Sequence, residues 1–273
     1  MADQVATITL NRPAARNGFT LSMADELGAA MRTADADSGV GAVVLTGAGA
    51  NFCVGMDMTE GESGTEDHTA PDWVEPAARV ARPMYRMNKP VIAAIRGAAI
   101  GVGSTMILPA DFRICSRDAR FGYVFARRGL FPEGGSLWFL PRIVGLGTAK
   151  DWMITGRIID ATEALAAGLV TAVYETDDLL RKAYELAREL IATTAPVSVA
   201  VIRRALVEMT TMQTPDAAFA LDAKLISHAF SSADSVEGIS SFLERRAPQF
   251  TGRTDSDLPG FLPWASGAAV SSG

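Results

Sequence analysis

Short apolar runs alternate with longer stretches of helical periodicity over the first two thirds of the chain. Runs bounded by Gly, Pro or polar residues predict strands at 5–10, 40–46, 90–95, 111–115 and 169–174. Apolar residues at helical spacing predict helices that begin at Ser22, with Asp25 three residues later, and at 76–87, 137–144, 148–155 and 162–167. Strands that alternate with helices are typical of an α/β core.

The pattern after residue 177 is helical throughout. Four helices are predicted at 178–194, 197–211, 216–230 and 234–246, with Pro196 and Pro215 at helix starts. We therefore expect a core over 1–195 and a helical C-terminal region over 196–255. Residues 256–273, where Ser, Gly and Ala are frequent, are expected to form a flexible tail.

Composition and charge exclude several classes of protein. The chain has 273 residues, 48% of them hydrophobic, and a net charge of −6 without a basic run, which argues against a nucleic-acid partner. Arg96 and three glycines interrupt the apolar stretch 91–110, so a buried strand and helix are expected there rather than a membrane span. Two cysteines cannot form a disulfide framework, and no targeting segment is recognised. We expect a cytoplasmic protein without a membrane partner.

The segment 89–135 carries the clearest chemical signal. A glycine-rich turn at 97–103 lies between a predicted strand and a short helix, where backbone N–H groups can approach an anionic ligand. Glu133 stands between Pro132 and Gly134, a constrained position that suits a proton-transfer group, although a capping role for the next helix is also open. An anion-stabilising turn with a base downstream suggests enolate chemistry.

Motifs for cofactors and metals are weak. Gly47-x-Gly49 and Gly101-x-Gly103 lack the third glycine of a dinucleotide fingerprint. No metal-ligand spacing is present, and His68 and His228 are interpreted as a solvated loop residue and a structural helix residue. No metal and no cofactor are expected.

Several segments, in order, resemble the crotonase (enoyl-CoA hydratase/isomerase) superfamily. They are FCVGMDM at 52–58, KPVIAAIRG at 89–97, PEGG at 132–135, and FLERR and FTGR near residues 242–253. The resemblance covers about residues 5–253. It implies a spiral of ββα units, an acyl-CoA thioester whose CoA is part of the substrate, and trimers or dimers of trimers held by the helical C-terminal region.

The resemblance also implies which residues form the site. The backbone N–H groups of Met56 and Val102 would form the oxyanion hole, which tolerates variation of their side chains. Arg16 would contact a CoA phosphate, with Asn17 beside it. Phe250 and Arg253 would reach the CoA site of a neighbouring subunit. The other expected substrate-binding residues are Val54, Asp57, Gly101, Phe125 and Pro132.

The catalytic acids depart from the hydratase pattern. Thr105 and Phe125 occupy the positions at which hydratases of the family carry two glutamates, whereas Glu133 matches the peroxisomal type of Δ3,Δ2-enoyl-CoA isomerase. Double-bond isomerisation with Glu133 as proton shuttle is therefore the leading prediction. The alternatives are a 2-enoyl-CoA hydratase of fatty-acid oxidation that uses Glu133 alone, a related lyase or hydrolase, and a non-catalytic acyl-CoA-binding protein.

Two further expectations concern the surroundings of the site. Phe125, Leu130 and Phe131 would partly desolvate Glu133 and raise its pKa toward neutrality. The polar segment 59–72 would form a flap that shapes the acyl end of the pocket.

Overall fold

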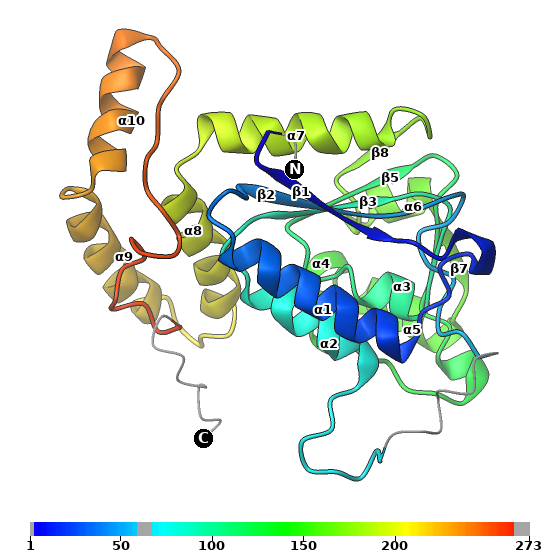
Figure 1. The fold of residues 1–273 in the computed structure, drawn as a ribbon. Coiled ribbons are helices and arrows are strands. Elements are labelled where there is room, and N and C mark those ends of the chain that lie inside the picture. Colours follow the sequence, from blue (N-terminus) through cyan, green and yellow to red (C-terminus); the bar gives the residue numbers. More distant parts are fainter. Residues whose placement is uncertain (1–2, 59–66, 265–273) are drawn as a thin grey trace.

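The computed structural model describes residues 3–58 and 67–264, and its centre is a parallel sheet (Figure 1). The strand order is β1-β2-β3-β5-β8, and every adjacent pair is parallel. The strands are β1 (Val5–Leu10), β2 (Ala42–Gly47), β3 (Val91–Ile95), β5 (Phe112–Ser116) and β8 (Ala172–Tyr174). All five coincide with predicted strands, although the last is shorter than the apolar run at 169–174.

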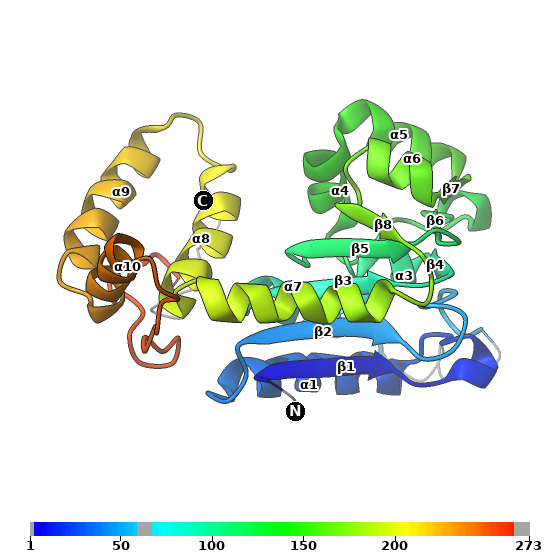
Figure 2. The same cartoon turned by 90° about the horizontal axis from the view of Figure 1, so that it is seen from above.

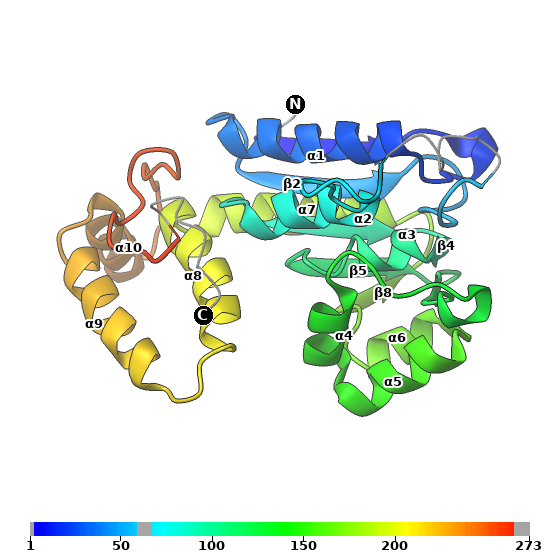
Figure 3. The same ribbon diagram turned by 90° about the horizontal axis from the view of Figure 1, so that it is seen from below.

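Helices cover both faces of this sheet. α7 (Leu179–Thr193) lies across one face, and α1 (Leu21–Ala36) and α2 (Pro76–Arg86) lie on the other (Figures 1 and 3). Alternate residues of β3 point to opposite faces, so Ile92 and Ala94 pack with α7 while Val91, Ala93 and Ile95 join the larger core. A strand buried on both faces must be apolar throughout, which explains the continuous hydrophobic runs.

A second, three-stranded sheet was not evident from the sequence. It consists of β4 (Ala98–Ile100), β6 (Arg120–Gly122) and β7 (Ile158–Asp160). β4 lies inside the segment predicted as a glycine-rich turn. It pairs in parallel with β6, and Ala99 also forms a bridge with Cys53. Strands of three residues are too short to show an alternating pattern.

The remaining helices of the core are α3 (Val102–Thr105), α4 (Ser136–Val144), α5 (Leu146–Thr155) and α6 (Ala161–Ala166). The start of α1 differs from the prediction. Thr20, rather than Ser22, caps this helix, and its hydroxyl accepts a hydrogen bond of 3.1 Å from the N–H of Met23. Ser22 instead donates to Glu26.

The last three helices extend to one side of the sheet (Figure 2). They are α8 (Pro196–Met209), α9 (Asp216–Ala229) and α10 (Ala233–Glu244), and their own small core contains Val201, Leu221 and Leu262. Leu258 and Trp264 also pack there, within the segment 256–273 for which a flexible tail stays a prediction. Residues 265–273 lie outside the described part of the chain.

A helix that crosses a membrane must be both long and apolar, and this requirement serves as a test of the described helices. Among the described residues, no single helix is long and apolar enough to cross a membrane. α7 and α8 pass that test only jointly, as a pair bent by 112°, and only by length and composition.

Candidate active site

Two glycine loops meet at the carboxyl end of the parallel sheet. Gly55 follows β2 with φ +104°, and Gly101 precedes α3 with φ +56°, conformations that favour glycine. A Cβ on Gly101 would lie 3.9 Å from the Cα of Gly55, and one on Gly55 would lie 3.2 Å from the carbonyl oxygen of Ile100. The segments that carry Met56 and Val102 are therefore in direct contact.

The backbone N–H groups of Met56 and Val102 lack backbone acceptors among the described residues. Phe19 forms a parallel bridge with Met56, in which the N–H of Asp57 donates to Phe19 at 2.8 Å. In such a bridge the N–H of the central residue, Met56, points to the other side. Val102 is the first residue of α3, where the N–H has no acceptor within the helix. Two donors thus remain available on adjoining segments.

Glu133 lies against the same helix. Its Oε1 accepts a hydrogen bond of 2.8 Å from the hydroxyl of Thr105, which is fully buried in the last turn of α3. Burial is the main cause of the raised pKa of the Cys53 thiol, and the charge of Glu133 raises that pKa further. The carboxylate therefore also lies near the loop that carries Gly55. A carboxylate and two N–H donors are therefore held by neighbouring segments.

Burial raises the pKa of Glu133 to about 7, from an ordinary value of 4.5. The Thr105 hydroxyl lowers the pKa by stabilising the ionised form, and the nearby negative charge of Glu75 raises it. Glu75 was not recognised from the sequence. The dipeptide Glu75-Pro76 was a usable signal, because an acidic residue before a proline is typical of a helix start.

The three apolar residues that were expected to desolvate Glu133 differ in their exposure. Phe125 is buried, but Leu130 and Phe131 are 53% and 87% exposed. Gly134, the next residue after Glu133, instead packs between α2 and α3. A Cβ on it would lie 3.2 Å from Ala77 and 3.5 Å from Thr105. The packing of the turn onto these helices therefore contributes to the burial of Glu133, and a contribution from Phe125 stays a prediction.

Asn17 and Asp57 are engaged in internal contacts. Asn17 is fully buried, accepts from the N–H of Arg12 and donates to the carbonyls of Ala48 and Asn51. Asp57 forms an ion pair of 3.0 Å with Arg12. The hydrogen bonds of the Asn17 side chain hold the loop after β2 in place, and a contribution of Asn17 to CoA binding stays a prediction.

The other expected ligand contacts lie at the same end of the sheet. The backbone of Arg16 adopts a left-handed conformation, with φ +52°. The side chain is exposed and is therefore available to a charged ligand. Val54 and Pro132 are half-buried neighbours of Gly55 and Glu133.

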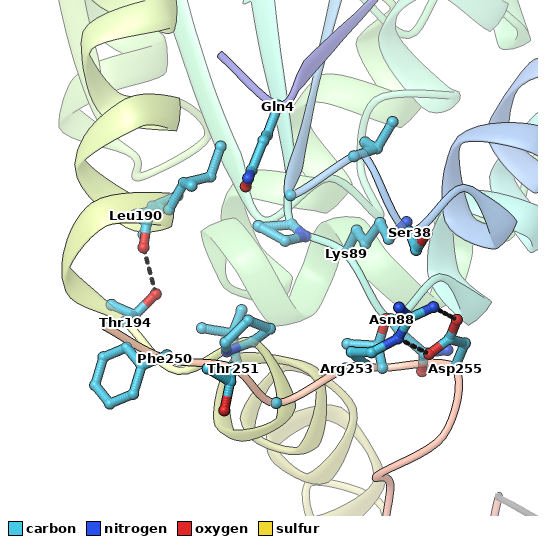
Figure 4. Close-up of a pocket in the computed structure, with 18 of the residues that line it drawn as sticks. Gln4, Ser38, Asn88, Lys89, Leu190, Thr194, Phe250, Thr251, Arg253 and Asp255 are labelled. Carbon is cyan, nitrogen blue, oxygen red and sulfur yellow. Dashed lines mark hydrogen bonds and ion pairs between the residues drawn. The ribbon is translucent and has the colours of Figure 1, made fainter. Parts of the chain in front are cut away.

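Phe250 and Arg253 lie at the opposite end of the sheet. They line a cleft of about 420 Å³ together with Gln4 and Lys89, which stand beside the beginnings of β1 and β3 (Figure 4). Arg253 pairs there with Asp255 at 2.6 Å. Within one chain, therefore, these residues do not meet Glu133, and a role in a neighbouring subunit's site stays a prediction.

The expected flap is only partly described, because residues 59–66 lie outside the described part of the chain. In the described part, the His68 ring packs edge-on against Trp73 with centroids 5.1 Å apart. His228 lies in α9 and packs against Phe261. Across residues 3–58 and 67–264, no three His, Cys, Asp or Glu side chains gather in a way that could hold a metal ion.

This arrangement can polarise a carbonyl group and move a proton beside it. Comparisons with known proteins agree with such chemistry. A profile of the family described as enoyl-CoA hydratase/isomerase matches residues 1–253. The chain is 35% identical to the enoyl-CoA hydratase ACTT3 of Alternaria alternata, over 91% of this chain and 83% of that one. It is also 35% identical to the 1,2-epoxyphenylacetyl-CoA isomerase of Escherichia coli, over 91% and 95%.

A solved structure extends the likeness to three dimensions. The enoyl-CoA hydratase of Bacillus anthracis superposes with a TM-score of 0.82 at 29% identity, over 91% of this chain and 96% of that one. The order of strands and helices described above is thus the crotonase fold. The chain belongs to the enoyl-CoA hydratase/isomerase family of the crotonase superfamily.

Proposed function

We propose that this enzyme of the hydratase/isomerase type converts 3-enoyl-CoA into 2-enoyl-CoA. Glu133 removes a proton from C2 of the thioester, and negative charge develops on the thioester oxygen. The N–H groups of Met56 and Val102 hold that oxygen. Protonated Glu133 then returns the proton to C4, so the double bond moves by one position and no atom is gained or lost.

The observation that carries this proposal is the contact of Glu133 with α3. Its carboxylate meets Thr105 at 2.8 Å, one turn after the Val102 donor. A pKa of about 7 suits a group that must both accept and return a proton at neutral pH. The reaction needs no cofactor and no metal, because CoA is part of the substrate.

Hydration is the principal alternative. It requires a water molecule to be activated while a second proton is handled at C2, a task that suits two carboxylates. Thr105 and Phe125 supply none, which favours the isomerase. The relatives named above include both hydratases and an isomerase, so their names alone do not decide.

The test is a side-by-side assay on 3-enoyl-CoA and 2-enoyl-CoA. We expect isomerisation of the first to dominate, and Glu133→Gln to lower its kcat by on the order of 10³. Binding of a saturated acyl-CoA, measured by calorimetry, should be unchanged in that variant. Glu175→Gln, at an exposed ion pair with Arg117, serves as the matched control and should keep full activity.

Each other result has a definite meaning. Dominant hydration of 2-enoyl-CoA that is lost with Glu133→Gln would establish the hydratase. Tight acyl-CoA binding without turnover of either substrate would establish the binding protein. Full activity of folded Glu133→Gln would mean that another residue transfers the proton.

We also propose that the enzyme assembles as a trimer or a dimer of trimers. Large apolar side chains are exposed on the last helices, among them Ile202 and Leu206 on α8, Phe219 and Phe230 at α9, and Phe242 and Leu243 on α10. An apolar surface of this kind is typical of subunit contacts. Light scattering that shows a monomer at working concentration would contradict this.

A further inference from the structure

Glu75 joins the start of α2 to the turn that carries Glu133. Its Oε2 accepts a hydrogen bond of 2.7 Å from the N–H of Ala77, in the first turn of the helix. Its Oε1 accepts another of 2.7 Å from the N–H of Gly134. Because both oxygens accept hydrogen bonds from backbone N–H groups, these contacts hold the carboxyl group in a fixed position. The residue after Glu133 is thereby tied to α2.

Thr105 holds Glu133 from the other side. Its hydroxyl lies 2.8 Å from Oε1 of Glu133 and 3.4 Å from the carbonyl oxygen of Val102. A hydroxyl can donate one hydrogen and accept others. It can therefore donate to ionised Glu133, or accept from protonated Glu133 while it turns its own hydrogen toward Val102. A proton shuttle needs a neighbour that satisfies both of its states.

The two neighbours act on the charge of Glu133 in opposite directions. The Thr105 hydrogen bond lowers the pKa of Glu133, and the charge of Glu75 raises it, on top of the larger effect of burial. Three described groups interact with this carboxyl: Thr105 of α3 by a hydrogen bond, and Glu75, the N-cap of α2, and Cys53, in the loop after β2, through charge effects. The pKa of Cys53 is about 12, so this thiol stays neutral at physiological pH.

We propose that Glu75 and Thr105 are positioning residues, which hold Glu133 between α2 and α3 and balance its readiness to accept a proton against its readiness to return one. This inference rests on the proposed function, in which Glu133 is the shuttle. It adds that Thr105, which stands where hydratases of the family carry a glutamate, positions Glu133 through its hydroxyl group.

The experiment is a titration of the Glu133 carboxyl by ¹³C NMR in the substrate-free protein, with its signal assigned from its loss in Glu133→Gln. Glu75→Gln should lower the midpoint by at least about half a pH unit, and Thr105→Val should raise it by a similar amount. Thr105→Ser keeps the hydroxyl and should return the midpoint toward that of the wild type. The acid limb of kcat/KM for 3-enoyl-CoA should move in the same directions.

Asp160→Asn is the matched control, because Asp160 caps α6 by accepting from the N–H of Glu163 at 2.9 Å, outside the site. It should leave the midpoint unchanged. Midpoints that stay fixed in both Glu75→Gln and Thr105→Val, or that move in one direction in both, would overturn the inference. If Glu75→Gln does not fold, an unchanged midpoint in Thr105→Val overturns it alone.

The failure of the proposed function would look different. In that case the midpoints would shift as expected, yet Glu133→Gln would still isomerise 3-enoyl-CoA. Loss of isomerisation in Glu133→Gln with unmoved midpoints would instead retain the function and reject the roles of Glu75 and Thr105.

Discussion

The two ends of the parallel sheet use their polar groups in opposite ways. At the carboxyl end, the N–H groups of Met56 and Val102 lack backbone acceptors among the described residues, and Glu133 is held where burial raises its pKa. At the amino end, the Lys89 ammonium donates to the carbonyls of Ala34 and Asp37, and Arg253 is paired with Asp255. The amino end forms a cleft, but the potentially reactive groups lie at the carboxyl end.

The difference shows why a cleft alone does not identify an active site. The cleft beside Lys89 is lined by residues whose charges are already satisfied within the chain (Figure 4). The proposed chemistry depends instead on two backbone donors and a buried carboxylate, groups whose burial costs stability and is typical of functional sites. Residues at the amino end can serve the reaction only through assembly with another subunit.

After the loss expected for Glu133→Gln, the largest effect on turnover is expected at the oxyanion hole. Val102→Pro removes one N–H donor and should lower kcat by on the order of 10²–10³. The variant is expected to fold, because Val102 is the first residue of α3, a position where proline is tolerated. Val102→Ala keeps the N–H and is the control, with activity near that of the wild type. Full activity in folded Val102→Pro would show that this turn does not bind the thioester oxygen.

The second prediction concerns stability and pH. A carboxyl whose pKa is raised in the folded state stabilises the protein fully below its unfolded pKa, and this contribution is lost as the pH rises through about 7. Glu133→Gln removes the cost of burying the charge. It should therefore gain roughly 2–3 kcal/mol over the wild type near pH 8 and little near pH 4.5. Thermal unfolding at both pH values measures this, and an equal gain at both would contradict the assigned burial.

The fold was more predictable from the sequence than the site. Strands of the main sheet were recognised because burial on both faces requires continuous apolar runs, as in β3. The glycine turns were also visible, since few residues tolerate their conformation. Glu75 and the bond from Thr105 were not, because they join segments about 30 to 60 residues apart in sequence, and no local pattern records such contacts. The predicted contact of Arg253 with CoA would require a second subunit, so neither the sequence pattern nor the fold of one chain tests it.

A smaller effect, on KM, should show whether the amino end of the sheet takes part in substrate binding. If Arg253 contacts CoA across a subunit boundary, Arg253→Ala should raise KM by about tenfold and leave kcat unchanged. Phe242→Glu, on the exposed face of α10, should raise KM similarly, but through loss of the proposed trimer, which light scattering would detect. Leu180→Glu, at an exposed position on α7, is the control and should leave both unchanged. An unchanged KM in Arg253→Ala would confine this end to structural roles.

The smallest expected effect tests whether the carboxyl end works through its backbone rather than through side chains. Met56 contributes only an N–H group to the proposed oxyanion hole, and its side chain is half-buried. Met56→Ala keeps that N–H and should lower kcat by less than about threefold, in contrast to Val102→Pro. Steady-state kinetics on 3-enoyl-CoA distinguish the two. A loss of kcat in Met56→Ala as large as in Val102→Pro would mean that the Met56 side chain also contributes to catalysis, through contact with the acyl group.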